Sequence, residues 1–400
     1  MSSTAFSNFP VDPGSTQKGA RNRVHVRAVN RRVIVTVARK VGQATITKMA
    51  AFGTVLGLSL ALAACSNADT NDGEADSSGR TIEATEFAKI GDTHKNSKMG
   101  PHYNNLLEGP VFGPDGYLYL TDVAAPAGEP KVLKLNMDTK EVTAVYTDGS
   151  SVFSSAQFSP NDRKLYLTDF TGAIKRMDAD GTNVETLLEG PVEGRTMVAD
   201  DIAFDRDGNM YITDLAGSPW NPTGRIIRLG ANGGPATVIQ DGLAGPNGIS
   251  FNLDYSRLWV SEYTANRMSN LELTEDGLGV ATGSIRMYAS YGLGPGDHGE
   301  NPAALDSTAV DADGNIYQAV LGAGEILVWN SAGDLIATVV TNNEDGVRQL
   351  SVTNLAIEPG TTNAYATVAG KDGSYIYSFD ALGVGISQTN GGGLAEVPAS

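Results

Sequence analysis

A short motif occurs six times in this chain: a turn rich in Asp, Asn and Gly, followed by an apolar strand centred on an aromatic residue. The aromatic anchors are Tyr119, Tyr166, Tyr211, Trp259, Tyr317 and Tyr365. Successive anchors are separated by 45 to 58 residues. A period of about 45 residues that contains several short strands is typical of a four-stranded sheet repeated around a central channel. The repeat therefore predicts an all-β, six-bladed β-propeller.

The segments between the anchors supply the remaining strands of each repeat. Residues 224–230 (GRIIRLG) and 236–242 (ATVIQDG) alternate apolar and polar side chains, as half-buried strands do. No long segment has the periodicity of a helix. We expect the propeller to span residues 83–385, with residues 84–92 (ATEFAKIGD) adding a strand to the last blade and closing the ring. Residues 386–400 are expected to form a flexible tail.

The N-terminal segment differs in charge from the rest of the chain. Residues 1–65 contain nine Lys or Arg and one acid, Asp12, and an apolar run from Met49 to Ala64 precedes Cys65. This run is shorter than the roughly 20 residues that a membrane-spanning helix needs. Its end, Leu-Ala-Ala-Cys, resembles the bacterial lipobox, in which the cysteine is lipidated. We therefore expect a lipoprotein signal peptide at 1–64; the alternative is a retained membrane anchor.

Cys65 is then the first mature residue, and residues 65–82 are expected to form a disordered tether because residues 66–79 are polar and rich in Ser, Asp and Gly. These features predict an exported protein that is lipid-anchored on the extracytoplasmic side of the cell membrane. Its membrane partner would be the bilayer surface, reached through the acyl chains.

Composition excludes several classes of function. Cys65 is the only cysteine, so the chain can form no intramolecular disulfide, Cys-rich zinc site or redox pair. The whole chain carries a formal charge of −17 and the leader +8, so the body carries about −25. Nucleic acid is therefore not expected as a partner, because its phosphates are bound mainly through Lys and Arg. An acidic surface is compatible with metal cations and neutral substrates.

A set of polar residues lies just before apolar strands, each up to 12 positions ahead of an aromatic anchor. The set consists of Glu108, Asp200 with Asp201, Asn247, and Asp306 with Ser307. Similar offsets in different blades place side chains at similar points of a ring, so these oxygens are expected to converge on the channel. Buried carboxylates repel one another unless a cation neutralises them, and oxygen-only ligands favour calcium. The alternative is that each side chain only bonds a neighbouring strand end.

The sequence resembles the senescence-marker-protein, gluconolactonase and luciferin-regenerating-enzyme family, and most closely its drug-responsive lactonase branch. The resemblance spans roughly residues 100–370 and is carried by EGPVFGPDGYLYLTD, ADDIAFDRDGNMYITDLAGSPWNPTG, NGISFNLDYSRLWVSEYTANR and LDSTAVDADGNIYQAVLGAGEILVWN. It implies that one catalytic Ca²⁺ is held by Glu108, Asp200, Asn247, Asp306 and Ser307, with Asp306 transferring protons.

The lactonase branch also has a second, structural calcium. The resemblance implies that it would be held partly near the loop EGPVEGRTMVADD, where only Glu193, Thr196 and the backbone near Val198 correspond to it. The partner segment TDFTGAIKRM is shorter than in the family, which counts against a second ion here.

These residues lead to the hypothesis of a calcium-dependent hydrolase that opens small lactones of the 1,4-lactone or sugar-lactone type. Two alternatives remain open: a calcium-dependent phosphotriesterase of the same fold, and a non-catalytic propeller that binds ligands at the cell surface. A monomer is expected, since an anchored propeller can act alone.

Overall fold

The computed structural model describes residues 79–97, 99, 104–295 and 302–387. Within these ranges the chain forms 24 β-strands and no helix, so the predicted all-β class is confirmed. The described part accordingly contains no helix that could cross a membrane.

Several predictions concern residues outside this part of the chain. They are the signal peptide at 1–64, the lipidated Cys65, the tether up to residue 78 and the end of the tail after residue 387. The first strand begins at Arg80, so residues 80–82, assigned to the tether from sequence, belong to a strand.

Four sheets have four strands each, and each follows the chain in order. The first sheet contains β2 (Leu107–Phe112), β3 (Leu118–Asp122), β4 (Pro130–Leu135) and β5 (Val142–Thr147). The second sheet contains β6 (Phe153–Phe158), β7 (Leu165–Asp169), β8 (Ala173–Met177) and β9 (Glu185–Leu188). The third sheet contains β10 (Ala199–Phe204), β11 (Met210–Asp214), β12 (Gly224–Leu229) and β13 (Ala236–Leu243). The fourth sheet contains β14 (Pro246–Phe251), β15 (Arg257–Glu262), β16 (Arg267–Leu273) and β17 (Val280–Tyr288).

A fifth sheet has eight strands in the order β18-β19-β20-β21-β1-β24-β23-β22. Its members are β18 (Ala304–Val310), β19 (Ile316–Leu321), β20 (Glu325–Trp329), β21 (Leu335–Thr341), β22 (Ser351–Ile357), β23 (Asn363–Ala369), β24 (Ser374–Asp380) and β1 (Arg80–Gly91).

Strand β1 joins the two halves of this sheet. Its first part, Arg80–Ala84, pairs parallel with β21, and its second part, Thr85–Gly91, pairs antiparallel with β24. The strand predicted from sequence at residues 84–92 is therefore present and pairs with the C-terminal strands. Because the two partners of β1 come from the last part of the chain, the N-terminal strand links chain ends that are about 300 residues apart in sequence.

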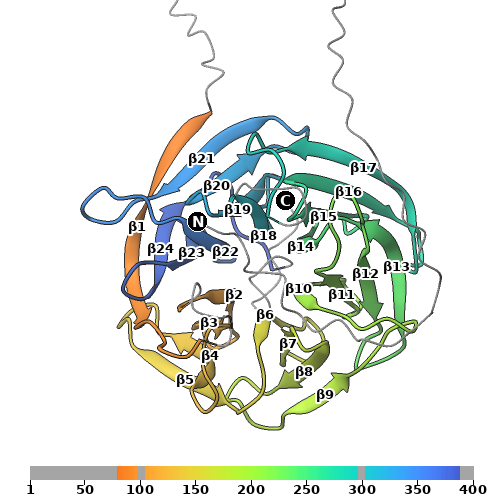
Figure 1. The fold of residues 1–400 in the computed structure, drawn as a ribbon, viewed down its shortest axis with the longest axis horizontal. Helices are drawn as coiled ribbons and strands as arrows, with labels where there is room; N and C mark the ends of the chain where they lie inside the picture. Colours follow the sequence, from red (N-terminus) through yellow and green to blue (C-terminus); the bar gives the residue numbers. More distant parts are fainter. Residues whose placement is uncertain (1–78, 98, 100–103, 296–301, 388–400) are drawn as a thin grey trace, which may run out of the picture. The chain divides into compact units, whose positions relative to one another are not determined.

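The sheets are arranged around a centre, with the first strand of each set innermost (Figure 1). Strands β2, β6, β10, β14, β18 and β22 each contact the next in this order, and β22 also contacts β2. All six are buried along nearly their whole length. The architecture is that of a propeller, in which radially packed sheets bury a continuous core.

The aromatic anchors of the repeat explain how neighbouring sheets pack. Tyr119 of β3 meets Phe158 of β6 edge to face at 5.0 Å between ring centroids. Tyr166 meets Phe204 at 5.1 Å in the same way, as does Tyr211 with Phe251. Each of these three anchors thus packs on the Phe that ends the innermost strand of the following sheet. Such pairs contribute about 0.5–1.5 kcal/mol each beyond the burial of their area.

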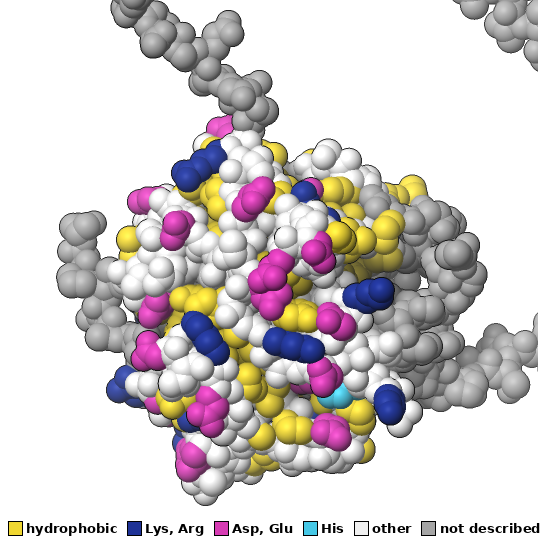
Figure 2. All heavy atoms as spheres, turned by 90° about the vertical axis from the view of Figure 1, so that its left-hand side faces the viewer, with side chains coloured by type: hydrophobic (Ala, Val, Ile, Leu, Met, Phe, Trp, Pro, Cys, Tyr) yellow, Lys and Arg dark blue, Asp and Glu magenta, His cyan; other side chains and the backbone are white. Residues whose placement is uncertain are grey.

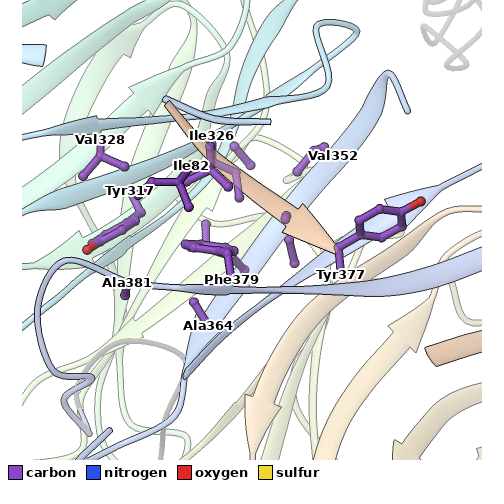
Figure 3. Close-up of a cluster of buried hydrophobic side chains, with 14 of the residues drawn as sticks. Ile82, Tyr317, Ile326, Val328, Val352, Ala364, Tyr377, Phe379 and Ala381 are labelled. Carbon is purple, nitrogen blue, oxygen red and sulfur yellow. The ribbon is translucent and has the colours of Figure 1, made fainter. Parts of the chain in front are cut away.

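The core also extends into the eight-stranded sheet. Figure 3 shows Ile82 of β1 among side chains of β19, β20, β22 and β24, including Tyr317, Val328 and Phe379. These residues are at least nine-tenths buried. On the outside, Figure 2 shows acidic side chains scattered over the face that it presents, with fewer Lys and Arg between them, in line with the acidic composition.

Removal of β1 is predicted to destabilise the fold. A chain that begins at Asp92 loses the buried side chains of Ile82, Ala84 and Ala88 and leaves β21 and β24 as open edges. The lost burial costs at least about 3 kcal/mol, and open edges promote aggregation. Thermal unfolding and sedimentation velocity would measure both effects, with a chain that begins at Gly79 as the control. Equal melting temperatures for the two chains would contradict the closing role of β1.

Candidate functional site

The residues predicted from sequence all lie on innermost strands. Glu108 lies on β2, Asp200 on β10, Asn247 on β14, and Asp306 and Ser307 on β18. Each is no more than 6% exposed. The structure therefore places these side chains at the inner wall of the ring, near the beginning of each strand.

A β-bulge occurs at each of these positions. The pairing of the innermost strand with its neighbour shifts between Glu108 and Val111 in β2, and between Ala199 and Ile202 in β10. Corresponding shifts occur between Pro246 and Ile249 and between Leu305 and Thr308. A bulge bends the strand and re-aims side chains that regular pairing would direct onto the sheet faces. The bulges therefore give the side chains at these positions directions that differ from those of a regular strand.

Hydroxyl groups of the second strands fix the backbone of the site residues. Thr168 donates a hydrogen bond to the carbonyl oxygen of Asp200. Thr213 Oγ1 donates to Asn247 O at 2.6 Å, and Ser261 Oγ donates to Asp306 O at 2.6 Å. Each hydroxyl belongs to the sheet that precedes the one it binds. Neighbouring sheets are thus connected where the site residues lie.

The buried acids interact with one another. Burial raises the pKa of Glu108 well above its ordinary value, and the negative charges of Asp306 and Asp200 raise it further. Burial followed by the charges of Asp306 and Asp201 raises the pKa of Asp200. The pKa of Asp306 is raised mainly by burial, with a hydrogen bond from Asn247 opposing the shift. These carboxylates cannot all be ionised at low cost unless a cation or protons compensate them.

Two residues of the site were missed in the sequence analysis. Asn354 of β22 donates from Nδ2 to Glu108 Oε2 at 3.1 Å, and Ser155 of β6 donates from Oγ to Asp201 Oδ1 at 2.6 Å. Asn354 lies 11 residues before the anchor Tyr365 and Ser155 lies 11 residues before Tyr166, the same offset at which Glu108 precedes Tyr119. The six-fold repeat contained this signal, but these two repeats carry no acid at the position, so residue type alone did not identify them.

The donor set fits a calcium ion in its chemistry. Asp200 Oδ2 and Asn247 Oδ1 are buried and accept no hydrogen bond. Together with Glu108 and Asp306 they provide only oxygen donors, which hard divalent cations prefer. Within the described ranges, no three His, Cys, Asp or Glu side chains converge closely enough to hold a metal ion by themselves.

Asn266 fixes the chain directly ahead of Asp306. Its Nδ2 donates to Ala303 O at 2.8 Å, and its Oδ1 accepts from Leu305 N at 2.9 Å. Asn266 has a positive φ of 48°, a conformation that Asn tolerates better than most residues. It also lines a mainly apolar surface cavity of about 250 Å³ together with Pro219. This cavity is lined by none of the proposed metal ligands.

The residues expected to hold a second calcium are already bound by protein donors. Glu193 Oε1 accepts a hydrogen bond from Val238 N at 3.0 Å. The carbonyl oxygen of Thr196 accepts from Arg225 Nη2 at 3.2 Å. The amide of Val198 donates to Asp214 Oδ1 at 2.8 Å. A second metal ion does not fit this arrangement.

Substitution of Gly248 by Ala is predicted to destabilise the ring beside the site. A Cβ at this position would lie 2.7 Å from both Asp306 O and Thr308 N, so β14 would have to move away from β18. Overpacking of this kind costs about 1–3 kcal/mol, which denaturant unfolding would detect. Gly149→Ala is the matched control, because a Cβ there meets no heavy atom within 4 Å. Equal stability of the two variants would show that the strands do not approach so closely.

Comparison with known proteins identifies the family of this chain. The profile of the SMP-30/Gluconolactonase/LRE-like region matches residues 106–353. The chain is 30% identical over 288 residues to "Lactonase drp35" of Staphylococcus saprophyticus, covering 70% of this chain and 84% of that protein.

Among solved structures, a luciferin-regenerating enzyme superposes with a TM-score of 0.59 at 17% identity, covering 79% of this chain and 99% of the other. Regucalcin of Agrobacterium tumefaciens, described as a calcium-binding protein, gives 0.54 at 17% identity, with 76% and 98% covered. At this identity the two structures establish the fold, while the profile and the lactonase establish kinship. The chain belongs to the SMP-30/gluconolactonase/LRE-like family.

Proposed function

We propose that this protein is a calcium-dependent lactonase that opens small lactones, of the 1,4-lactone or sugar-lactone type, at the centre of its ring. The observation that carries the proposal is the pair of buried, unpartnered oxygens on Asp200 and Asn247, set among acids that raise one another's pKa values. The relative named "Lactonase drp35" supports lactone hydrolysis, and the calcium-binding regucalcin supports the choice of ion.

The proposal includes a six-bladed architecture. The eight-stranded sheet then consists of two blades, β18 to β21 and β22 to β24 with β1, which β1 joins through its parallel pairing with β21. Six innermost strands in mutual contact and six aromatic anchors support this count. The site residues would then come from four of the six blades, at equivalent positions.

Glu108, Asp200, Asn247, Asp306 and Ser307 would hold the ion through their oxygen atoms, and no further ion is required. Bound calcium supplies a positive charge that stabilises the negative charge developing on the lactone carbonyl oxygen. Asn354 keeps Glu108 in place through the hydrogen bond between the two side chains. Ser155 does the same for Asp201, beside Asp200.

Asp306 moves the proton of the reaction. Its carboxylate accepts a proton from the attacking water as the water oxygen bonds to the carbonyl carbon. When the bond between that carbon and the ring oxygen breaks, Asp306 returns the proton to the ring oxygen, and the product is a hydroxy acid. Asn247 hydrogen-bonds the Asp306 side chain, Ser261 and Gln318 bind its carbonyl oxygen, and Asn266 fixes Leu305, so the carboxylate has a defined orientation.

The proposed cellular setting follows from the N-terminal sequence. A signal peptide would be removed ahead of Cys65, and acyl chains on Cys65 would hold a monomeric enzyme at the extracytoplasmic side of the cell membrane.

Cys65→Ser is predicted to release the protein from the membrane. Without the thiol no acyl chain can be attached, and a hydrophobic contribution of roughly 0.8 kcal/mol per methylene is lost. Fractionation of cells that express either form, followed by immunoblotting, would measure the change, with Ser66→Ala as the control. Membrane association of the Cys65→Ser form in carbonate-washed fractions would favour a retained membrane anchor.

Asp306→Asn is predicted to lower kcat for γ-butyrolactone hydrolysis by about 10²–10⁴-fold, since an amide cannot accept the proton. A pH-stat assay would measure the rate, and circular dichroism would show that the fold persists. Asp207→Asn is the control, because Asp207 lies in an exposed hairpin turn. Turnover by Asp306→Asn at the rate of the control would remove Asp306 from the mechanism.

Calcium removal is predicted to abolish the activity reversibly. Excess EDTA should stop hydrolysis because it removes the positive charge that compensates the buried carboxylates. Added Ca²⁺ should restore the activity. Full activity in excess EDTA would refute the calcium-dependent mechanism, whatever the result for Asp306.

A further inference from the structure

Arg225, at the beginning of β12, is among the largest fully buried side chains in the part of the chain that the structure describes. Its Nε donates to Asp214 Oδ2 at 2.7 Å, and both side chains are 1% exposed. Its two other nitrogens bind the loop that precedes β10. Nη1 donates to Val192 O at 2.9 Å, and Nη2 donates to Thr196 O at 3.2 Å and to Arg195 O at 3.4 Å.

The same ion pair also holds the last residues of that loop. Asp214 Oδ1 accepts from Val198 N at 2.8 Å, and Leu215 N donates to Val198 O at 2.8 Å. Val198 lies two residues before Asp200. The segment 192–198 is therefore attached to the Arg225 and Asp214 pair along its whole length, up to the point where the site strand begins.

Three carbonyl oxygens and a carboxylate that converge in a buried place form a donor set suited to a cation. Here the guanidinium occupies that place, and its fixed fork of donors matches several oxygens at once. An acid and a base occupy corresponding positions in the next sheet, where Glu262 accepts from Ala244 N at 2.8 Å and pairs with Arg267 at 2.7 Å. Arg225 differs because it adds the loop carbonyls to this arrangement.

We propose that Arg225 acts as the built-in cation of the segment 192–198. It replaces a structural metal ion and acts as a positioning residue for Asp200. The chain consequently binds one calcium ion, at the centre of the ring, and the order of the segment does not depend on calcium. The number of calcium ions bound and the effect of Arg225 on Asp200 rest on the proposed function. The order of segment 192–198 in the absence of calcium does not.

Two measurements on the purified full chain test this proposal. Isothermal titration of the EDTA-stripped protein with Ca²⁺ gives the number of ions and their affinity. Hydrogen exchange followed by mass spectrometry gives the protection of residues 192–198 with and without Ca²⁺. The variants are Arg225→Lys, which keeps the charge but offers one nitrogen in place of the fork of three, and the neutral pair Arg225→Met with Asp214→Asn, which avoids an unpaired buried acid.

The control is Arg176→Met. Arg176 also forms several hydrogen bonds, to Glu185, Asp162 and Tyr166, but none to the segment or to a site residue. The wild type is expected to bind one Ca²⁺ and to protect the segment equally in EDTA. Both Arg225 variants should lose that protection and bind Ca²⁺ about 10-fold more weakly, as for other residues that orient metal ligands. The control should match the wild type.

Two bound ions in the wild type, or protection of 192–198 only in Ca²⁺, would overturn the proposal. If the Arg225 variants melt at a lower temperature but bind Ca²⁺ with wild-type affinity, Arg225 stabilises the fold and does not position Asp200. A wild type that binds no Ca²⁺ would refute the proposed function instead. Protection lost in the Arg225 variants would then still support the built-in cation, and unchanged protection would reject it.

Discussion

Repulsion among buried carboxylates is the constraint on which the rest of the structure depends. Glu108, Asp200 and Asp306 lie on three different sheets, yet burial and their neighbours' charges raise the pKa values of Glu108 and Asp200. Taking one such group out of water costs free energy, and bringing several together multiplies the cost. A ring of sheets with a continuous core can provide this free energy, because each sheet is packed on two neighbours.

Hydrogen bonds between neighbouring sheets hold the site residues in place. Thr213 and Ser261 each bind the backbone carbonyl of a site residue in the following sheet, and Asn354 connects β22 to Glu108 on β2. The polar side chains are therefore held by groups from adjacent sheets as well as by their own. This arrangement suits a function in which a small ligand meets several side chains at once.

Converging oxygen atoms can be compensated by a cation from solution or by a positively charged side chain. At the loop before β10 the protein carries its own, on Arg225, and the loop carbonyls point at it. At the centre of the ring no Lys or Arg is hydrogen-bonded or ion-paired to Glu108, Asp200 or Asp306 among the described contacts. The loop before β10 therefore has its compensating charge built into the chain, whereas the described contacts of the three acids include no such charge.

The sequence by itself determined the all-β class, the strand at 84–92 and the inner-strand location of Glu108, Asp200, Asn247 and Asp306. These features follow from local periodicity, because one repeat folds like the next and equal offsets from an anchor give equal positions. The tertiary structure alone decided the partners of the site: Asn354, Ser155, Asn266 and Arg225. Each acts on a residue from another repeat or from a distant loop, and such contacts depend on how sheets pack, which no local pattern of residues encodes.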